Sequence, residues 1–182
     1  MQYLPDYIRP GVQVLLVGIN PGLRSAHLGH HFAGHSNRFW KLLYESRMIT
    51  EPLGYQEDWR LPEWGIGLTN MIPRPTPGCS DLKPHEYVAA LEALKRKVEQ
   101  FRPPILALLG VTLGRIIVAH SSEGTTSRPI KRTEAPMGRQ YLRFGGAEVF
   151  VIPNPSGRNT YYSYQRQLSL FQDLQQLTLE KK

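Results

Sequence analysis

Two short apolar segments of this chain run directly into nearly the same loop sequence. Residues 14–17 (VLLV) lead into GINPGL at 18–23, and residues 149–152 (VFVI) lead into PNPSGR at 153–158. Unbroken apolar runs are typical of strands that are buried on both faces, as in parallel sheets covered by helices. Proline and glycine fix the backbone after each strand, so an asparagine is held where each strand ends. Ligands bind at the carboxyl ends of strands in such sheets, which makes these two loops the first candidate site.

The order of the other predicted elements also favours an α/β fold with helices on both faces of a parallel sheet. Further strands are predicted at residues 65–71, 105–109, 140–144 and 148–152, the last two joined by a hairpin turn at Gly145-Gly146. Residues 24–36 are expected to form a long loop, which ends where Ser36 or Asn37 caps a helix that carries Phe39, Trp40, Leu43 and Tyr44 on one side. Other helices are predicted after Pro84, from Val111 to Ala119 and from Tyr164 to Leu179. At 182 residues, the chain is expected to be one domain spanning residues 1–182.

Composition excludes several classes of protein. No apolar run approaches the roughly 20 residues that span a bilayer, and the first residues lack the pattern of a signal peptide, so a cytoplasmic protein is expected. Cys79 is the only cysteine, which excludes an intrachain disulfide and a four-thiolate iron–sulfur cluster. No cationic run adjoins Cys79, so we expect it to be a structural or incidental thiol rather than a reactive one.

The chain is basic, with a formal net charge of +7. Positive residues gather between positions 128 and 143, at Arg128, Lys131, Arg132, Arg139 and Arg143. A basic domain suits a polyanion such as nucleic acid, but the same charges also suit a solvated surface. Charge alone does not decide between these two interpretations.

A series of short motifs follows along the chain: GINPGL at 18–23, GHHF at 29–32, NRFWK at 37–41, GIGLTNM at 65–71, TPGCSDL at 76–82 and PNPSG at 153–157. In order and spacing, from about residue 12 to residue 164, they resemble the mismatch-specific uracil/thymine DNA glycosylase family of the uracil-DNA glycosylase superfamily. The resemblance implies an α/β fold, a three-layer αβα sandwich with a short central, mainly parallel sheet. It also implies hydrolysis of the N-glycosidic bond of a damaged or mispaired pyrimidine that is flipped out of duplex DNA.

Asn20 is the predicted catalytic residue. Glycosidic cleavage passes through an oxocarbenium-like state, which needs a positioned water and a stabilised leaving group. An asparagine can orient water without accepting its proton as a base would, so a modest rate is expected. The alternative is that Asn20 only caps the turn before Pro21.

The resemblance places the substrate-binding residues around the flipped base. Phe32 is predicted to stack on the base, unless it is a core anchor, and Asn70 is predicted to read its edge, unless it only forms a turn. Ser25 and His31 are expected in the pocket wall, where they would select which base fits. Main-chain N–H groups, including that of Ile19, are expected to steady the leaving base. His30 and His31 are a poor metal pair because adjacent histidines diverge, and no metal or cofactor is expected.

The loop from Pro153 to Asn159 resembles the loop that enters the duplex in this family. Asn154 occupies the position where several uracil glycosylases carry a histidine. Arg158 is predicted to fill the vacated stack and to bond the orphaned guanine or a phosphate, the alternative being an ordinary surface arginine. Ser156 and Gly157 are predicted to grip phosphate.

These predictions describe a monofunctional DNA glycosylase of base-excision repair, acting on uracil and on thymine opposite guanine. We expect a monomer that binds double-stranded DNA, without lyase activity because no lysine occupies a matching motif. Three alternatives stay open: a non-catalytic module that binds damaged DNA, a glycosylase for deaminated purines such as hypoxanthine, and a phosphate-ester or nucleotide hydrolase. The last is disfavoured because no carboxylate cluster accompanies either loop.

Overall fold

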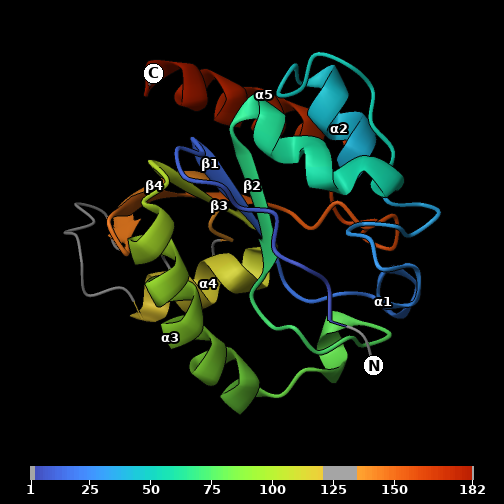
Figure 1. Cartoon of the computed structure of the whole chain (residues 1–182). Helices are drawn as coiled ribbons and strands as arrows, with labels where there is room; N and C mark the ends of the chain where they lie inside the picture. Colours follow the sequence, from blue (N-terminus) through green and yellow to red (C-terminus); the bar gives the residue numbers. More distant parts are fainter. Residues whose placement is uncertain (1–2, 121–134, 182) are drawn as a thin grey trace.

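A five-stranded sheet forms the centre of the molecule (Figure 1), in a computed structural model that describes residues 3–120 and 135–181. The strands are β1 (Val14–Gly18), β2 (Ile66–Asn70), β3 (Ile105–Leu109), β4 (Gly138–Phe144) and β5 (Ala147–Ile152), in the spatial order β2-β1-β3-β5-β4. All neighbouring pairs are parallel except β4 and β5, which pair antiparallel. The predicted mainly parallel sheet is therefore confirmed, and the carboxyl ends of four strands meet at one edge.

Helices cover both faces of the sheet, as Figure 1 shows. α2 (Phe39–Glu45), α5 (Tyr164–Glu180) and the 3-10 segment η1 (Tyr55–Trp64) cover one face, and α3 (Pro84–Phe101) and α4 (Val111–His120) cover the other. Two shorter elements, α1 (Leu23–Leu28) and η2 (Cys79–Asp81), lie near the carboxyl ends of the strands. The predicted three-layer αβα sandwich is confirmed.

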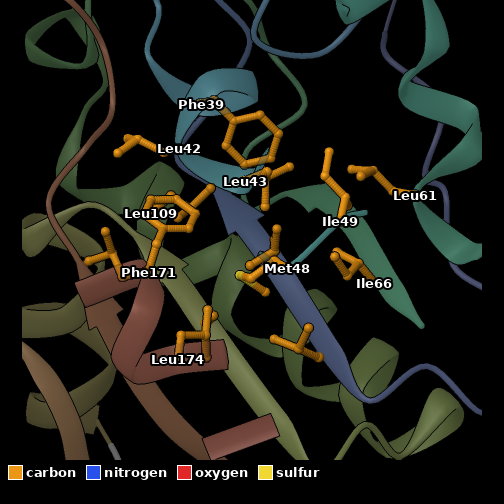
Figure 2. Close-up of a cluster of buried hydrophobic side chains, with 14 of the residues drawn as sticks. Phe39, Leu42, Leu43, Met48, Ile49, Leu61, Ile66, Leu109, Phe171 and Leu174 are labelled. Atoms are coloured by element: carbon orange, nitrogen blue, oxygen red, sulfur yellow. The ribbon is translucent and has the colours of Figure 1, made fainter. Parts of the chain in front are cut away.

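The strand sequences explain this layering, because alternate side chains point to opposite faces. In β1, Val14 and Leu16 pack into the core beneath α2 and α5, whereas Leu15 and Val17 pack into the core beneath α3 and α4. Both faces are covered, so every residue of β1 is buried. Figure 2 shows part of the first core, in which Phe39 and Leu43 of α2 meet Phe171 and Leu174 of α5. Truncating one of these side chains to alanine costs about 2–5 kcal/mol of unfolding free energy.

The structure corrects two expectations at residues 24–44. Residues 23–28 form helix α1 where a loop was expected, and the helix ends at Gly29, whose φ of 77° suits glycine and whose N–H donates to the carbonyl of Ser25. Tyr44 does not share the buried side of α2, because it is 44% exposed and Leu42 is buried in its place. A six-residue helix has too few residues for a clear apolar period, which explains why α1 was missed.

Other expectations held or lie outside the described residues. The hairpin at Gly145-Gly146 is confirmed, with φ values of 56° and 87° that two-residue hairpin turns require. Of the basic residues between 128 and 143, only Arg139 and Arg143 fall within the described residues. No helix in the described part of the chain is long and apolar enough to cross a membrane.

Candidate functional site

The carboxyl ends of the parallel strands surround one pocket of about 820 Å³. Both Asn-Pro loops line it: the first Asn-Pro loop, residues 18–23, and the second Asn-Pro loop, residues 153–158. All predicted site residues except Gly157 line this pocket, namely Ile19, Asn20, Ser25, His31, Phe32, Asn70, Asn154, Ser156 and Arg158. The topology thus brings together residues that are far apart in the sequence.

Asn20 is held by a segment that lies more than 50 positions away in the sequence. Its Nδ2 donates to the carbonyl oxygen of Arg74 at 3.0 Å and to Oγ1 of Thr76 at 2.7 Å. A carbonyl oxygen can only accept, so flipping the amide would place oxygen against oxygen. The orientation of the amide is therefore fixed, which leaves Oδ1 of Asn20 as the atom that can accept a hydrogen bond from a ligand or water.

Thr76 has a single role in this contact because its own hydroxyl hydrogen is already used. Oγ1 of Thr76 donates to the carbonyl of Gly78 at 2.7 Å, so it can only accept from Asn20. The main chain of Thr76 also donates to the carbonyl of Pro21 at 3.1 Å, and the residue is 2% exposed. The segment around Thr76 is thus bonded along the first Asn-Pro loop and orients its asparagine.

Phe32 forms a stacked pair with a core residue. Its ring lies 3.9 Å from that of Phe39, centroid to centroid, at an interplanar angle of 23°. Phe39 is fully buried and also contacts the ring of Phe171 edge-on. Phe32 therefore lines the pocket with a ring whose other face is supported by the hydrophobic core.

The backbone around Phe32 is strained and firmly held. Phe32 has a φ of 53°, which is rare outside glycine and costs about 1–3 kcal/mol. The N–H of Ala33 donates to Oγ of Ser25 at 3.0 Å, and the carbonyl of Ala33 accepts from Nε of Arg24 at 2.8 Å. On the other side, the N–H of His31 donates to the carboxylate of Asp58 at 2.8 Å. These bonds on both sides keep Phe32 in its left-handed conformation.

Asp58 is a fully buried carboxylate beside the pocket that sequence reasoning did not find. Besides His31, it contacts Nδ1 of His30 at 3.1 Å. Burial, together with the neighbouring Asp58, raises the pKa of Tyr7 to about 12. Asp58 thus holds the main chain at His31, a residue that lines the pocket.

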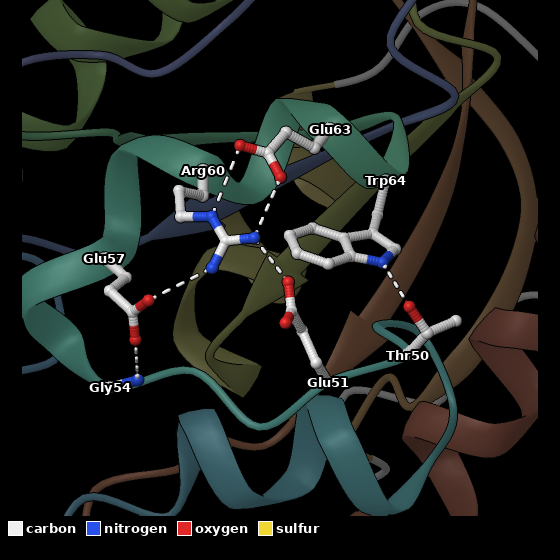
Figure 3. Close-up of polar contacts among 7 residues, drawn as sticks. All are labelled: Thr50, Glu51, Gly54, Glu57, Arg60, Glu63 and Trp64. Carbon is white, nitrogen blue, oxygen red and sulfur yellow. Dashed lines mark hydrogen bonds and ion pairs between the residues drawn. The ribbon is translucent and has the colours of Figure 1, made fainter.

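The segment that carries Asp58 is held by a surface network (Figure 3). The Arg60 guanidinium forms ion pairs with three carboxylates, those of Glu51, Glu57 and Glu63. It also lies 5.4 Å from the ring centroid of Trp64, whose Nε1 donates to Oγ1 of Thr50 at 3.0 Å. Exposed ion pairs are individually weak, but several on one guanidinium restrain residues 50–64 together.

His31 and Asn70 form a hydrogen-bonded chain with a fixed direction. Nε2 of His31 lies 2.8 Å from the carbonyl oxygen of Pro5, so this nitrogen must carry a hydrogen. Burial lowers the pKa of His31, which keeps the ring neutral and leaves Nδ1 without a hydrogen. Nδ1 therefore accepts from Nδ2 of Asn70 at 3.3 Å. The amide oxygen of Asn70 remains as a hydrogen-bond acceptor beside the pocket.

Gly18 allows Asn70 and Phe32 to meet at the end of β1. A Cβ atom at position 18 would lie 2.5 Å from Oδ1 of Asn70 and 3.4 Å from the ring of Phe32. No side chain fits in that space without displacing the Asn70 amide. Glycine is thus required here for close approach.

The second Asn-Pro loop is organised by local contacts. Oδ1 of Asn154 accepts from the N–H of Ser156 at 2.9 Å, which closes a turn within the loop. Gly157 packs against Ser36 so closely that a Cβ atom would lie 2.4 Å from the Ser36 carbonyl oxygen. Arg158 is exposed, and its Nη1 donates to the carbonyl of Pro77 at 2.8 Å. Its guanidinium therefore joins the second Asn-Pro loop to the segment beside Thr76, at the rim of the pocket.

Three comparisons with known proteins agree with this architecture. Residues 5–177 match the Uracil DNA glycosylase superfamily, and the chain belongs to that superfamily. It is 34% identical over 173 residues to a G/U mismatch-specific uracil DNA glycosylase of Schizosaccharomyces pombe, a match that covers 94% of this chain and 52% of that protein. The chain thus spans about half the length of that relative. Its fold is similar to the solution NMR structure of a Methanosarcina acetivorans protein assigned as a uracil DNA glycosylase, with a TM-score of 0.63, 18% identity, and coverage of 96% and 98% of the two chains.

Proposed function

We propose that this chain is a monofunctional DNA glycosylase that removes uracil opposite guanine in duplex DNA, with thymine and other damaged pyrimidines as further candidate substrates. The observation that carries the proposal is that Phe32 and an asparagine of fixed orientation, Asn20, line one pocket. Membership of the superfamily and the similarity to a G/U mismatch-specific relative support it.

The pocket suits a base that has left the helix. A stacked base is out of reach of catalytic groups, so it must be extruded, at a cost of a few kcal/mol. The face of Phe32 that is turned away from Phe39 offers a stacking surface, and base–aromatic stacking returns about 1–3 kcal/mol. Because the core already fixes the ring of Phe32, binding of the base carries no further entropic cost for ordering this side chain.

Asn70 provides selectivity among pyrimidines. Uracil and thymine present an N–H at ring position 3, whereas cytosine presents a lone pair there. The free oxygen of Asn70 accepts from the former and repels the latter, and the contact to His31 prevents the amide from flipping. Such a mismatch leaves a buried polar group unpaired, which costs about 1–3 kcal/mol.

Hydrolysis then requires a water held in line with the glycosidic bond. Oδ1 of Asn20 accepts a hydrogen bond from this water and directs its oxygen to C1′ of the sugar. The C1′–O bond forms as the C1′–N1 bond breaks, the base leaves as an anion, and the water proton passes to solvent. Since an amide is not a base, the hundred- to ten-thousand-fold contribution that general-base catalysis typically makes, on the order of 3–5 kcal/mol, is partly missing. No lysine lines the pocket within the described residues, which supports an abasic product and an intact strand.

Arg158 would enter the space that the base vacates. The protein is proposed to bind double-stranded DNA as a monomer. In the free protein the Arg158 guanidinium donates to the carbonyl of Pro77, and this exposed hydrogen bond must break when DNA binds. An exposed hydrogen bond of this kind costs only about 1 kcal/mol to exchange for a new one. Contact between Arg158 and the guanine left unpaired by base flipping would make excision selective for lesions opposite guanine.

Single-turnover excision on defined oligonucleotides tests the proposal. Duplexes with G·U, A·U, G·T, G·hypoxanthine and G·C pairs, and single-stranded uracil, are incubated with the protein and then cleaved with alkali. We expect the G·U duplex to be processed fastest. We also expect its strand to break only after the alkali treatment. Equal rates on G·U, A·U and single strands would contradict selectivity for guanine, and strand breaks without alkali would contradict a monofunctional enzyme. Binding without any excision would establish the non-catalytic module, and fastest cleavage of hypoxanthine would establish the purine glycosylase.

A further inference from the structure

The loop that continues from Arg158 carries the most exposed large hydrophobic side chain of the described residues. Tyr161 is 86% exposed, and its ring packs edge-on against Tyr162 with the centroids 5.0 Å apart at 71°. Tyr162 lines the pocket. Tyr161 thus lies at the rim of the candidate site, outside the pocket itself.

Tight turns connect Tyr161 to the second Asn-Pro loop. The N–H of Asn159 donates to the carbonyl of Ser156 at 2.9 Å, and the N–H of Thr160 donates to the carbonyl of Arg158 at 3.1 Å. These bonds compact residues 156–160, so Arg158 and Tyr161 belong to one short, folded loop.

The start of this loop is tied to the helical layer. The main-chain N–H of Arg38 donates to the carbonyl of Pro155 at 2.9 Å. Gln167, which is fully buried in α5, donates from Nε2 to the carbonyl of Asn154 at 3.1 Å. These are protein-internal bonds that do not depend on a ligand.

The end of the loop is tied to Arg38 as well. Nη1 of Arg38 donates to the carbonyl of Tyr162 at 3.3 Å and to Oε1 of Gln167 at 3.4 Å. Both ends of the loop are therefore bonded to Arg38, the residue before α2, and Arg38 is itself bonded to Gln167 of α5. A loop restrained in this way presents its exposed side chains with little further entropy to lose on binding.

We propose that Tyr161 is a second DNA-contacting residue, which stacks on a nucleobase next to the position that Arg158 enters. The inference rests on the DNA-binding face of the proposed function. The ligand is assigned as a nucleobase because an exposed aromatic ring beside a cation at the rim of a base pocket matches the stacking-plus-charge pattern of nucleic-acid binding. The stack is sequence-tolerant, since every base has a π-face, so Tyr161 contributes affinity for the duplex rather than a choice of lesion.

The test measures binding and base stacking separately from excision. The duplex carries a tetrahydrofuran abasic analogue, which needs no cleavage, and 2-aminopurine in the pairs flanking it. Tyr161→Ala is compared with Tyr161→Phe, which keeps the ring, and with Tyr141→Ala, which removes a tyrosine that is 76% exposed on edge strand β4 and does not line the pocket.

We expect Tyr161→Ala to weaken duplex binding by about five- to 150-fold and to alter the 2-aminopurine fluorescence seen with the wild-type protein. Tyr161→Phe and Tyr141→Ala should bind within about twofold of wild type, and excision at saturating Tyr161→Ala should keep its rate. Wild-type affinity in Tyr161→Ala overturns the inference, as does an equal loss in Tyr161→Phe, which would assign the contact to the hydroxyl. Because the analogue is not cleaved, ring-dependent binding without any excision of uracil would reject the proposed function while leaving this contact in place.

Discussion

The two Asn-Pro loops begin from similar sequences, but their asparagine side chains make opposite kinds of contact. Nδ2 of Asn20 donates to Arg74 and Thr76, 54 and 56 positions away. These bonds leave Oδ1 of Asn20 free to accept a hydrogen bond. Asn154 uses its oxygen within its own loop, on the N–H two residues later. The first asparagine is thus available for chemistry, and the second is committed to holding a turn. A shared motif therefore predicts a shared backbone shape and not a shared role.

The surroundings of the loops explain the difference. The first Asn-Pro loop follows central strand β1 and lies beside the segment after β2, which supplies carbonyl and hydroxyl partners. The second follows β5 and packs against Arg38 and Gln167, which occupy its main-chain carbonyls. One loop is built to face the pocket, and the other is built to hold Arg158 and its neighbours at the rim.

The largest expected effect comes from Asn20→Ala. We expect single-turnover excision of uracil from a G·U duplex to fall by about a hundredfold, because the water loses the acceptor that positions it. Binding to a duplex with a tetrahydrofuran site should be retained. The melting temperature serves as the control. A variant that fails to fold would assign Asn20 to turn capping, and would remove the contrast with Asn154.

Thr76→Val sharpens the comparison by removing the hydroxyl that accepts from Asn20, together with the bond of that hydroxyl to the Gly78 carbonyl. We expect excision to fall by about tenfold at saturating protein, since the amide loses one of the bonds that prevent its rotation. Thr76→Ser keeps the hydroxyl and should retain most of the rate. Equal losses in both variants would indicate that the methyl group, and hence packing, accounts for the effect.

The smallest effect is expected from Asn154→Ala. Losing the turn in the second Asn-Pro loop should lower the free energy of unfolding by about 0.5–1.5 kcal/mol and leave excision at saturating protein within about threefold of wild type. Thermal unfolding and single-turnover rates measure the two quantities. Asn154→Asp, which keeps the acceptor for Ser156, is the matched control. A loss of excision as large as that of Asn20→Ala would show that the two asparagines share the chemistry after all.

Much of the fold could be predicted because burial leaves a strong local signal. Strands β1, β3 and β5 are covered on both faces, so their sequences are apolar except for Glu148 in β5. The three- and four-residue spacing in α3 marks a helix with one buried side. Short α1 has no such period and was expected to be a loop. The prediction failed where the segment was too short for periodicity to show.

The candidate site was predicted unevenly for a related reason. Asn20, Phe32 and Asn70 stand in recognisable motifs at strand ends, and the structure places all three on one pocket. Thr76 belongs to the TPGCSDL motif, but the sequence predicted no role for it, and buried Asp58 belongs to no motif. Their functions consist of contacts to residues 27 to 56 positions away, which no local pattern records.

By itself, the sequence determined which backbone shapes the chain can adopt: apolar strands, amphipathic helices, and rigid Asn-Pro turns at strand ends. The tertiary structure alone decided which polar atoms are left free inside the pocket. The neighbours that meet each asparagine set the orientation of its amide, because a partner that only accepts must face Nδ2 and a partner that only donates must face Oδ1. For that reason Oδ1 of Asn20 and Oδ1 of Asn70 are acceptors toward the pocket, whereas Oδ1 of Asn154 is taken by its own loop.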